Sequence, residues 1–156
     1  MTYIELKDRC ERQMALAVCD GCTACWLRCA DGVQASQDEW TVIERQIADL
    51  KDPERERLET IVTQSKSVDL GDGVSVTMCR FFDMHTHRCA IYSARPLVCR
   101  LLGHVEWLPC PINQVPAVVP TPDALALMRS YAQHERRTFA EWENAMNMPP
   151  VASQEA

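Results

Sequence analysis

Hydrophobic residues near the start of the chain follow a helical period. In residues 3–17, apolar side chains recur every three or four positions, which predicts one amphipathic helix that ends near Gly21. Cys10 lies on this stripe, so we interpret it as a small core residue rather than as a metal ligand. The members of the stripe are Tyr3, Leu6, Cys10, Met14 and Ala17.

Two further helices are predicted between residues 36 and 65. Ser36 and Glu39 have the spacing of a capping box, and Asp52-Pro53 places proline at the first position of a second helix. Together they indicate a helical hairpin with a charged outer face. Its buried side chains should be Trp40, Ile43, Ile47 and Leu50 in the first helix and Leu58, Ile61, Val62 and Ser65 in the second.

The middle of the chain changes to a period of two. Gly71-Asp72-Gly73 interrupts the helical pattern, and alternation over residues 74–78 predicts a short strand. Residues 80–82 and 89–92 should form a small hairpin around residues 83–88. Pro96 then opens a short helix through Leu102, which Gly103 closes.

The last third of the chain begins with a proline-rich loop over residues 109–120. Thr121-Pro122-Asp123 predicts the start of a helix with Leu125, Met128 and Tyr131 on one face. Thr138 and Glu141 predict a restart that adds Phe139, Trp142 and Met146, and Pro149-Pro150 should end it.

The predicted elements define a fold class. We expect a mainly α (α+β) protein, a small helical domain with a short β-hairpin, whose cysteine blocks converge on a metal centre. Residues 1–148 should form this single cysteine-cluster domain, and residues 149–156 a disordered tail.

Composition and charge exclude several classes of protein. The 156 residues are 47% hydrophobic and 24% charged, which is typical of a globular domain. A net charge of −6 argues against a nucleic-acid or anionic-membrane binder. No apolar run reaches the length of a membrane span, and the N-terminus lacks a secretory segment, so we expect a cytoplasmic protein. Thiols remain reduced there, and nine cysteines fit a closed disulfide framework poorly.

Eight cysteines fall into two blocks with spacings that suit metal binding. The first block, C-D-G-C-T-A-C-W-L-R-C, has the C-x2-C-x2-C-x3-C spacing of bacterial ferredoxins, although Ala30 replaces the proline that usually follows. In ferredoxins the fourth cysteine ligates a different cluster from the first three, so the spacing leaves open whether these four share one site. The candidate ligands are Cys19, Cys22, Cys25 and Cys29 in the first block and Cys79, Cys89, Cys99 and Cys110 in the second.

The second block is more widely spaced and more basic. Its first three cysteines are ten residues apart, and a Cys110-Pro111 pair at its end is a candidate to close a distant cluster. Residues 79–104 hold four arginines and one aspartate, a net charge of +3, so the rest of the chain carries −9. Positive charge stabilises partly buried thiolates, so the arginines fit a thiolate metal site. The alternative interpretation is that they are scattered surface residues.

The stretch from Cys79 to Arg100 resembles the second half of the YkgJ-type cysteine-cluster family. The family pattern runs C-x-F-L, C-x-I-Y and R-P-x-x-C-R, and the first block is similar to its C-x-x-C-x-x-C-C, with Cys29 set four residues after Cys25. Over roughly residues 19–110, the resemblance implies a zinc or iron centre related to the cysteine cluster of flagellin lysine methylases. The other matching residues are Phe81, Ile91, Tyr92, Arg95, Pro96 and Arg100.

The donor types bear on which metal is bound. Eight thiols without an obvious histidine pair favour an iron–sulfur cofactor, [4Fe–4S], over structural zinc, which usually takes paired Cys/His knuckles. His85 and His87 form H-x-H, which we place in a hairpin turn rather than at a metal. His104 is a candidate to donate a hydrogen bond to a sulfur.

Three functions remain open from the sequence. The first is an iron–sulfur protein in electron transfer or an accessory to a larger enzyme, with a redox partner or that enzyme as its contact. The second is a structural zinc domain that mediates protein contacts, and the third is an enzyme with an open coordination site. The sequence contains no nucleotide-binding loop and no nucleophile elbow.

Overall fold

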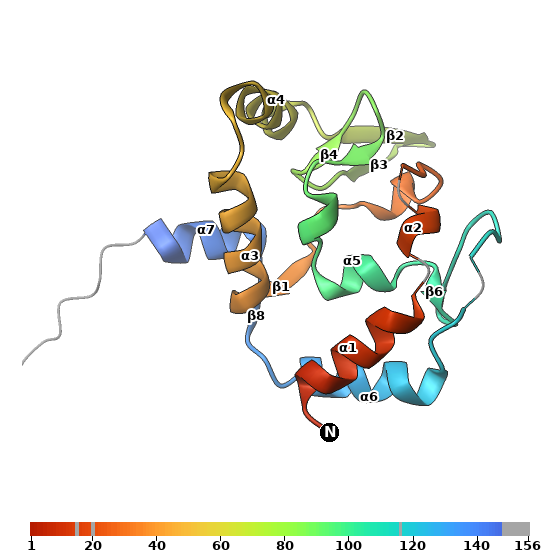
Figure 1. Ribbon diagram of the computed structural model, residues 1–156. Helices are drawn as coiled ribbons and strands as arrows, with labels where there is room; N and C mark the ends of the chain where they lie inside the picture. The colour runs from red at the N-terminus through yellow and green to blue at the C-terminus, as the bar shows by residue number, and fades with distance from the viewer. Residues whose placement is uncertain (15, 20, 116, 148–156) are drawn as a thin grey trace, which may run out of the picture.

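The computed structural model describes residues 1–14, 16–19, 21–115 and 117–147, and its chain folds into helices joined by short two-stranded sheets (Figure 1). The helices are α1 (Tyr3–Gln13), α2 (Leu16–Cys19), α3 (Gln37–Ala48), α4 (Asp52–Thr63), α5 (Leu97–Leu101), α6 (Thr121–Tyr131) and α7 (Phe139–Asn147), with 3₁₀ turns η1 (Trp26–Arg28) and η2 (Tyr92–Ala94). The predicted α+β class is therefore confirmed.

The β structure exceeds the single predicted hairpin. Four antiparallel pairs form within the described residues: β1 (Gln34–Ser36) with β8 (Arg136–Thr138), β2 (Ser67–Gly71) with β3 (Val74–Thr77), β4 (Phe82–Asp83) with β5 (Arg88–Cys89), and β6 (His104–Val105) with β7 (Leu108–Pro109). The β4–β5 hairpin and β3 match the predictions, whereas β1, β2, β6, β7 and β8 were not predicted. Asp72 and Gly73 both have positive φ, 52° and 75°, which suits the tight turn between β2 and β3.

Most helix starts follow the predicted signals. Ser36 and Glu39 form a reciprocal capping box at α3, α4 has proline in its first turn, and Pro96 precedes α5. The first helix is shorter than predicted. It ends at Gln13 because Met14 is extended (φ −77°, ψ 134°) and buries its side chain in the core.

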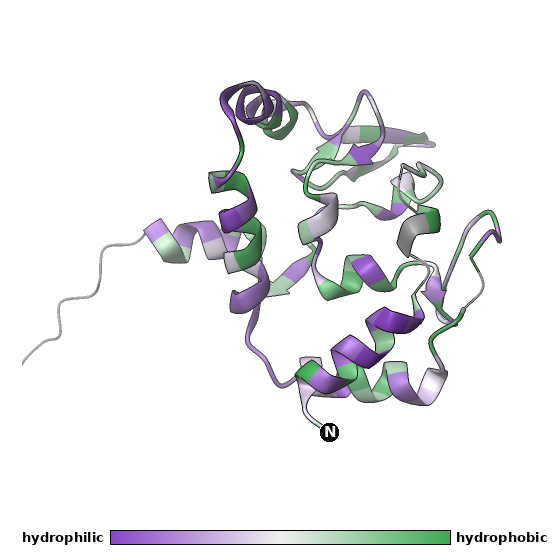
Figure 2. Cartoon of the chain, viewed as in Figure 1, coloured by the Kyte–Doolittle hydropathy of each residue, from purple (hydrophilic) through white to green (hydrophobic). Residues whose placement is uncertain are grey.

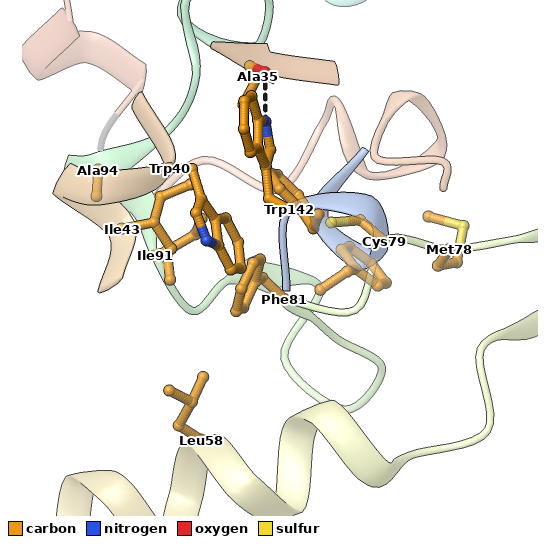
Figure 3. Close-up of a cluster of buried hydrophobic side chains, with 12 residues drawn as sticks. Ala35, Trp40, Ile43, Leu58, Met78, Cys79, Phe81, Ile91, Ala94 and Trp142 are labelled. Carbon is orange, nitrogen blue, oxygen red and sulfur yellow. Dashed lines mark hydrogen bonds between the residues drawn. The ribbon is translucent and has the colours of Figure 1, made fainter. Parts of the chain in front are cut away.

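The larger hydrophobic core joins segments that lie far apart in the sequence, from Ala35 in β1 to Trp142 in α7 (Figure 3). Phe139 of α7 packs against Phe81 and Trp40, with ring centroids 5.2 Å and 5.8 Å away. Trp142 donates a 2.7 Å hydrogen bond from Nε1 to the carbonyl of Ala35 in β1. The buried members are Ala35, Trp40, Ile43, Leu58, Met78, Cys79, Phe81, Phe82, Ile91, Ala94, Phe139 and Trp142.

A second core forms where α1 packs beside α6, as Figure 1 shows. Cys10 is fully buried in it, which confirms Cys10 as a core residue. Leu97 and Leu101 of α5 belong to the same cluster, so α5 connects this core to the cysteine segments. The remaining buried members are Met14, Val105, Val119, Ala124, Leu127 and Tyr131.

Several residues predicted on apolar helix faces are exposed to solvent instead. Val62, Leu125 and Met146 are 37%, 40% and 43% exposed. Helix α4 contacts β4 and buries Leu58 and Ile61. It packs less against α3 than the predicted helical hairpin requires. Its remaining surface is mostly hydrophilic (Figure 2). The predicted tail, residues 149–156, lies outside the described residues.

Candidate metal centre

The described residues of the first cysteine block are mostly irregular backbone. Helix α2 ends at Cys19, whose carbonyl accepts a 3.0 Å hydrogen bond from the amide of Cys22. The turn η1 then separates Cys25 from Cys29. At Gly21 (φ +75°) a Cβ atom would lie 3.7 Å from the guanidinium of Arg88, which brings the first block against the β4–β5 hairpin.

His104 contacts this block from β6. Its Nε2 lies 3.6 Å from Sγ of Cys19, as predicted for a residue that hydrogen-bonds a ligand sulfur. The ring is buried, and burial together with the charge of Arg95 lowers the pKa of His104. Its Nδ1 is buried and has no hydrogen-bond partner among the described residues, so a neutral ring with its proton on Nε2 fits this environment.

Cys110 joins the first block from the β7 end of the chain. Cys19, Cys22, Cys25 and Cys110 line one cavity of about 70 Å³. The backbone amides of residues 112–115 donate to the Cys110 sulfur and lower the pKa of its thiol. Arg28 holds this loop in place because its guanidinium donates to the carbonyl of Pro109.

Cys29 lies in a different environment from the other three cysteines of the first block. Its carbonyl accepts a 2.8 Å hydrogen bond from the amide of Cys79, and its thiol donates to the Cys79 sulfur. This shared hydrogen bond raises the pKa of Cys29 and lowers that of Cys79, which also accepts from the amide of Phe81.

Cys89 and Cys99 lie in the same environment as Cys29 and Cys79. The β4–β5 hairpin carries Cys89 and α5 carries Cys99. Burial raises the pKa of Cys89 to about 11, and burial with the charges of Cys89 and Cys79 raises that of Cys99 to about 12. Together with Cys22 and Cys25, Cys29 and its three neighbours line a cavity of about 290 Å³.

Arg95 lies between the two groups of cysteines and lines both cavities. Its guanidinium covers the ring of Tyr92 at 3.8 Å, and its charge favours the thiolate forms of cysteines in both groups. Two other arginines of the basic segment form ion pairs: Arg80 with Glu143 (2.5 Å) and Arg100 with Glu11 (2.8 Å). Arg95 is therefore the arginine of the basic segment that supports cysteines of both groups, and Arg80 also lowers the pKa of Cys79.

The two histidines of the H-x-H motif match their predicted place in a hairpin turn. His85 and His87 lie between β4 and β5, and the ring of His87 stacks on Trp26 at 4.7 Å. No sequence pattern predicts this stacking or the four amides that surround the Cys110 sulfur, because both depend on loop geometry.

The donor chemistry fits a soft metal. All nine cysteines are free thiols, and backbone amides or thiols donate to three of their sulfurs. In the part of the chain that the structure describes, no three His, Cys, Asp or Glu side chains stand in position to hold an ion. Convergence of the cysteines on a metal centre thus stays a prediction, as does the ligand set.

Comparison with known families identifies the class. Residues 18–140 match the family model CxxCxxCC, described as "Putative zinc- or iron-chelating domain", so the chain belongs to this family. The suspected cysteine-cluster family is thereby confirmed, and with it metal binding through zinc or iron. Comparisons with curated proteins and with solved structures gave no match. No helix in the described ranges is both long and apolar enough to cross a bilayer.

Proposed function

We propose that this protein carries a cysteine-ligated iron–sulfur centre of the [4Fe–4S] type and acts in electron transfer or as an accessory to a larger enzyme. The observation that supports this most is the cavity of about 290 Å³ lined by six cysteines. A single zinc ion needs far less room, because thiolates contact it at about 2.3 Å. The chemistry such a cluster supplies is one-electron transfer.

The chain's own groups fit that role. Amide donors to sulfur, such as those of Phe81 and Ile91, together with burial, set the potential of a thiolate-bound cluster. Cys22 is exposed, and the apolar side chains of Val18 and Ile112 beside it are 55% and 47% exposed. Such a rim suits contact with a redox partner or a larger enzyme, and we place the protein in the reducing cytoplasm.

Metal analysis tests this proposal. Protein purified without oxygen should be brown, should contain iron and acid-labile sulfide in equal amounts, and should lose visible absorbance in air. A colourless protein that holds zinc and no sulfide would contradict the iron–sulfur assignment.

A structural zinc domain is the second candidate. It is supported by the positions of Cys79, which belongs to one hydrophobic core, and of Cys99, which lies on α5 with Leu97 and Leu101 of the other core. A closed zinc–thiolate site there would hold the cores together.

A further inference from the structure

We propose that the eight cysteines form two separate four-cysteine metal sites, with Cys110 rather than Cys29 completing the C-x2-C-x2-C run. This inference rests on the proposed metal-binding function and specifies its ligands. The first site would hold Cys19, Cys22, Cys25 and Cys110, and the second Cys29, Cys79, Cys89 and Cys99.

The backbone path separates Cys29 from the first three cysteines. After η1 the chain turns toward the central hairpins, where the amide of Cys79 donates to the carbonyl of Cys29 and Ala30 forms a bridge with Met78. On the same side, Trp26 stacks on Phe82 and His87, with ring centroids 6.4 Å and 4.7 Å away. These contacts place Cys29 next to Cys79.

Loop geometry brings Cys110 to the other three. The amide of Gly103 donates a 2.7 Å hydrogen bond to the carbonyl of Leu108, which closes the β6–β7 turn. A Cβ atom at Gly103 (φ +86°) would lie 3.7 Å from Cβ of Cys110. The neighbouring His104 contacts Cys19, so one short segment places both Cys110 and the hydrogen-bond partner of Cys19.

The two cavities divide the sulfurs in the same way. Of the two, Cys19 and Cys110 line only the smaller cavity, whereas Cys29, Cys79, Cys89 and Cys99 line only the larger one. Cys22 and Cys25 also line the larger cavity, but only the smaller one brings them together with Cys19 and Cys110. Arg95 borders both cavities, as a cation shared by two anionic sites would.

Partial removal of metal from the intact protein tests this division. Zinc-loaded protein, produced in zinc medium, is treated with increasing chelator, and the thiols that open are alkylated and mapped in tryptic peptides. Cleavage after Arg28 separates Cys29 from Cys19, Cys22 and Cys25, and Cys110 falls in a third peptide. Cys89 and Cys99 remain in one peptide because Pro96 blocks cleavage after Arg95.

The two-site arrangement predicts two zinc ions per chain and two groups of thiols that open together. The peptide with Cys19, Cys22 and Cys25 should open with Cys110, and Cys29 should open with Cys79, Cys89 and Cys99. Opening of Cys29 with the first three cysteines, or of all eight at one zinc per chain, would overturn the arrangement and leave the metal-binding function standing. A protein that holds neither zinc nor iron would overturn both.

Substitutions provide a second measurement. Cys110→Ser and Cys29→Ser should each halve the zinc content, and Cys10→Ser, which lies in the core, is the matched control that should keep both ions. Loss of both ions from either single variant, with native circular dichroism, would contradict two independent sites. The chelation experiment uses the unsubstituted chain, so it tests the two-site arrangement even where a variant fails to fold.

Discussion

The carboxylate of Glu39 accepts a 2.7 Å hydrogen bond from the backbone amide of Leu97, 58 residues further along the chain. Leu97 is the first residue of α5, so this bond satisfies an amide that the helix itself leaves free. The other carboxylate oxygen accepts from the amide of Ser36 and from the hydroxyl of Tyr131. Glu39 thereby fixes the helix that carries Cys99 to α3 and α6.

Substitution of Glu39 should destabilise the protein strongly. Glu39→Ala removes the acceptor for three donors and should lower the free energy of unfolding by about 2–4 kcal/mol. Urea denaturation measures the change. The exposed Glu44 of the same helix is the control, and Glu44→Ala should change stability by less than about 0.5 kcal/mol. Equal effects of the two substitutions would show that the hydrogen bonds to Glu39 contribute nothing to stability.

His104 should affect metal affinity through Cys19 without ligating the metal. His104→Leu removes the ring nitrogen 3.6 Å from the Cys19 sulfur and should weaken metal binding by roughly 10–100-fold. His104→Gln, which keeps a donor, should recover part of the loss, and the exposed His85→Ala should have no effect. Competition with a chromogenic chelator gives the affinities. Complete loss of metal from His104→Leu protein that remains folded would indicate a ligand instead.

Metal loading should depend on pH. Burial raises the pKa of Cys89 to about 11 and that of Cys99 to about 12, so both are protonated at neutral pH and must release protons to a bound metal. The conditional affinity should therefore rise with pH, by about tenfold per pH unit for each proton displaced. Zinc titration in weak buffers at pH 6, 7 and 8 measures this slope, and an affinity independent of pH would contradict it.

Asp83 should contribute a pH-dependent part of the folding stability. Although burial opposes it, hydrogen bonds from Gln64, the His85 amide and Thr86 lower the pKa of Asp83 to about 2, from 3.8. A depressed folded-state pKa stabilises the protein above pH 3.8, and this contribution of about 2 kcal/mol disappears as the pH falls toward 2. The stability difference between the wild type and Asp83→Asn should thus shrink between pH 4.5 and pH 3 in urea titrations. A difference that stays constant over this range would disprove the assignment.

Removal of the metal should loosen the contact between the two cores. Cys79 belongs to the cluster around Trp40, and Cys99 lies on α5, which contributes Leu97 and Leu101 to the cluster around Leu127. Protonated thiols have no ion to hold these parts together. Chelated protein should melt at a lower temperature, by roughly 10 °C or more, and re-addition of the metal should restore the original transition. Differential scanning calorimetry follows both steps, and unchanged melting would place the metal outside the structural framework.

The sequence by itself determined the local structure and the chemistry. The capping box of Ser36 and Glu39, the proline at the start of α4 and the hairpin around residues 83–88 act over a few residues, so their patterns predict the elements directly. The density of thiols and the C-x-I-Y and R-P-x-x-C-R runs likewise identified a metal-binding family. These signals are short-range, and no tertiary contact is needed to read them.

Only the tertiary structure decided which distant residues meet. The pairing of β1 with β8, the hydrogen bond from Leu97 to Glu39 and the approach of Cys110 to Cys19 join segments separated by more than fifty residues. Hydrophobic burial drives the packing that brings such segments together, and it is non-directional and leaves no fixed spacing in the sequence. The run from Cys19 to Cys29 is continuous in sequence, but the fold places its last cysteine, Cys29, next to Cys79. For the same reason, the spacing of the run could not show this separation.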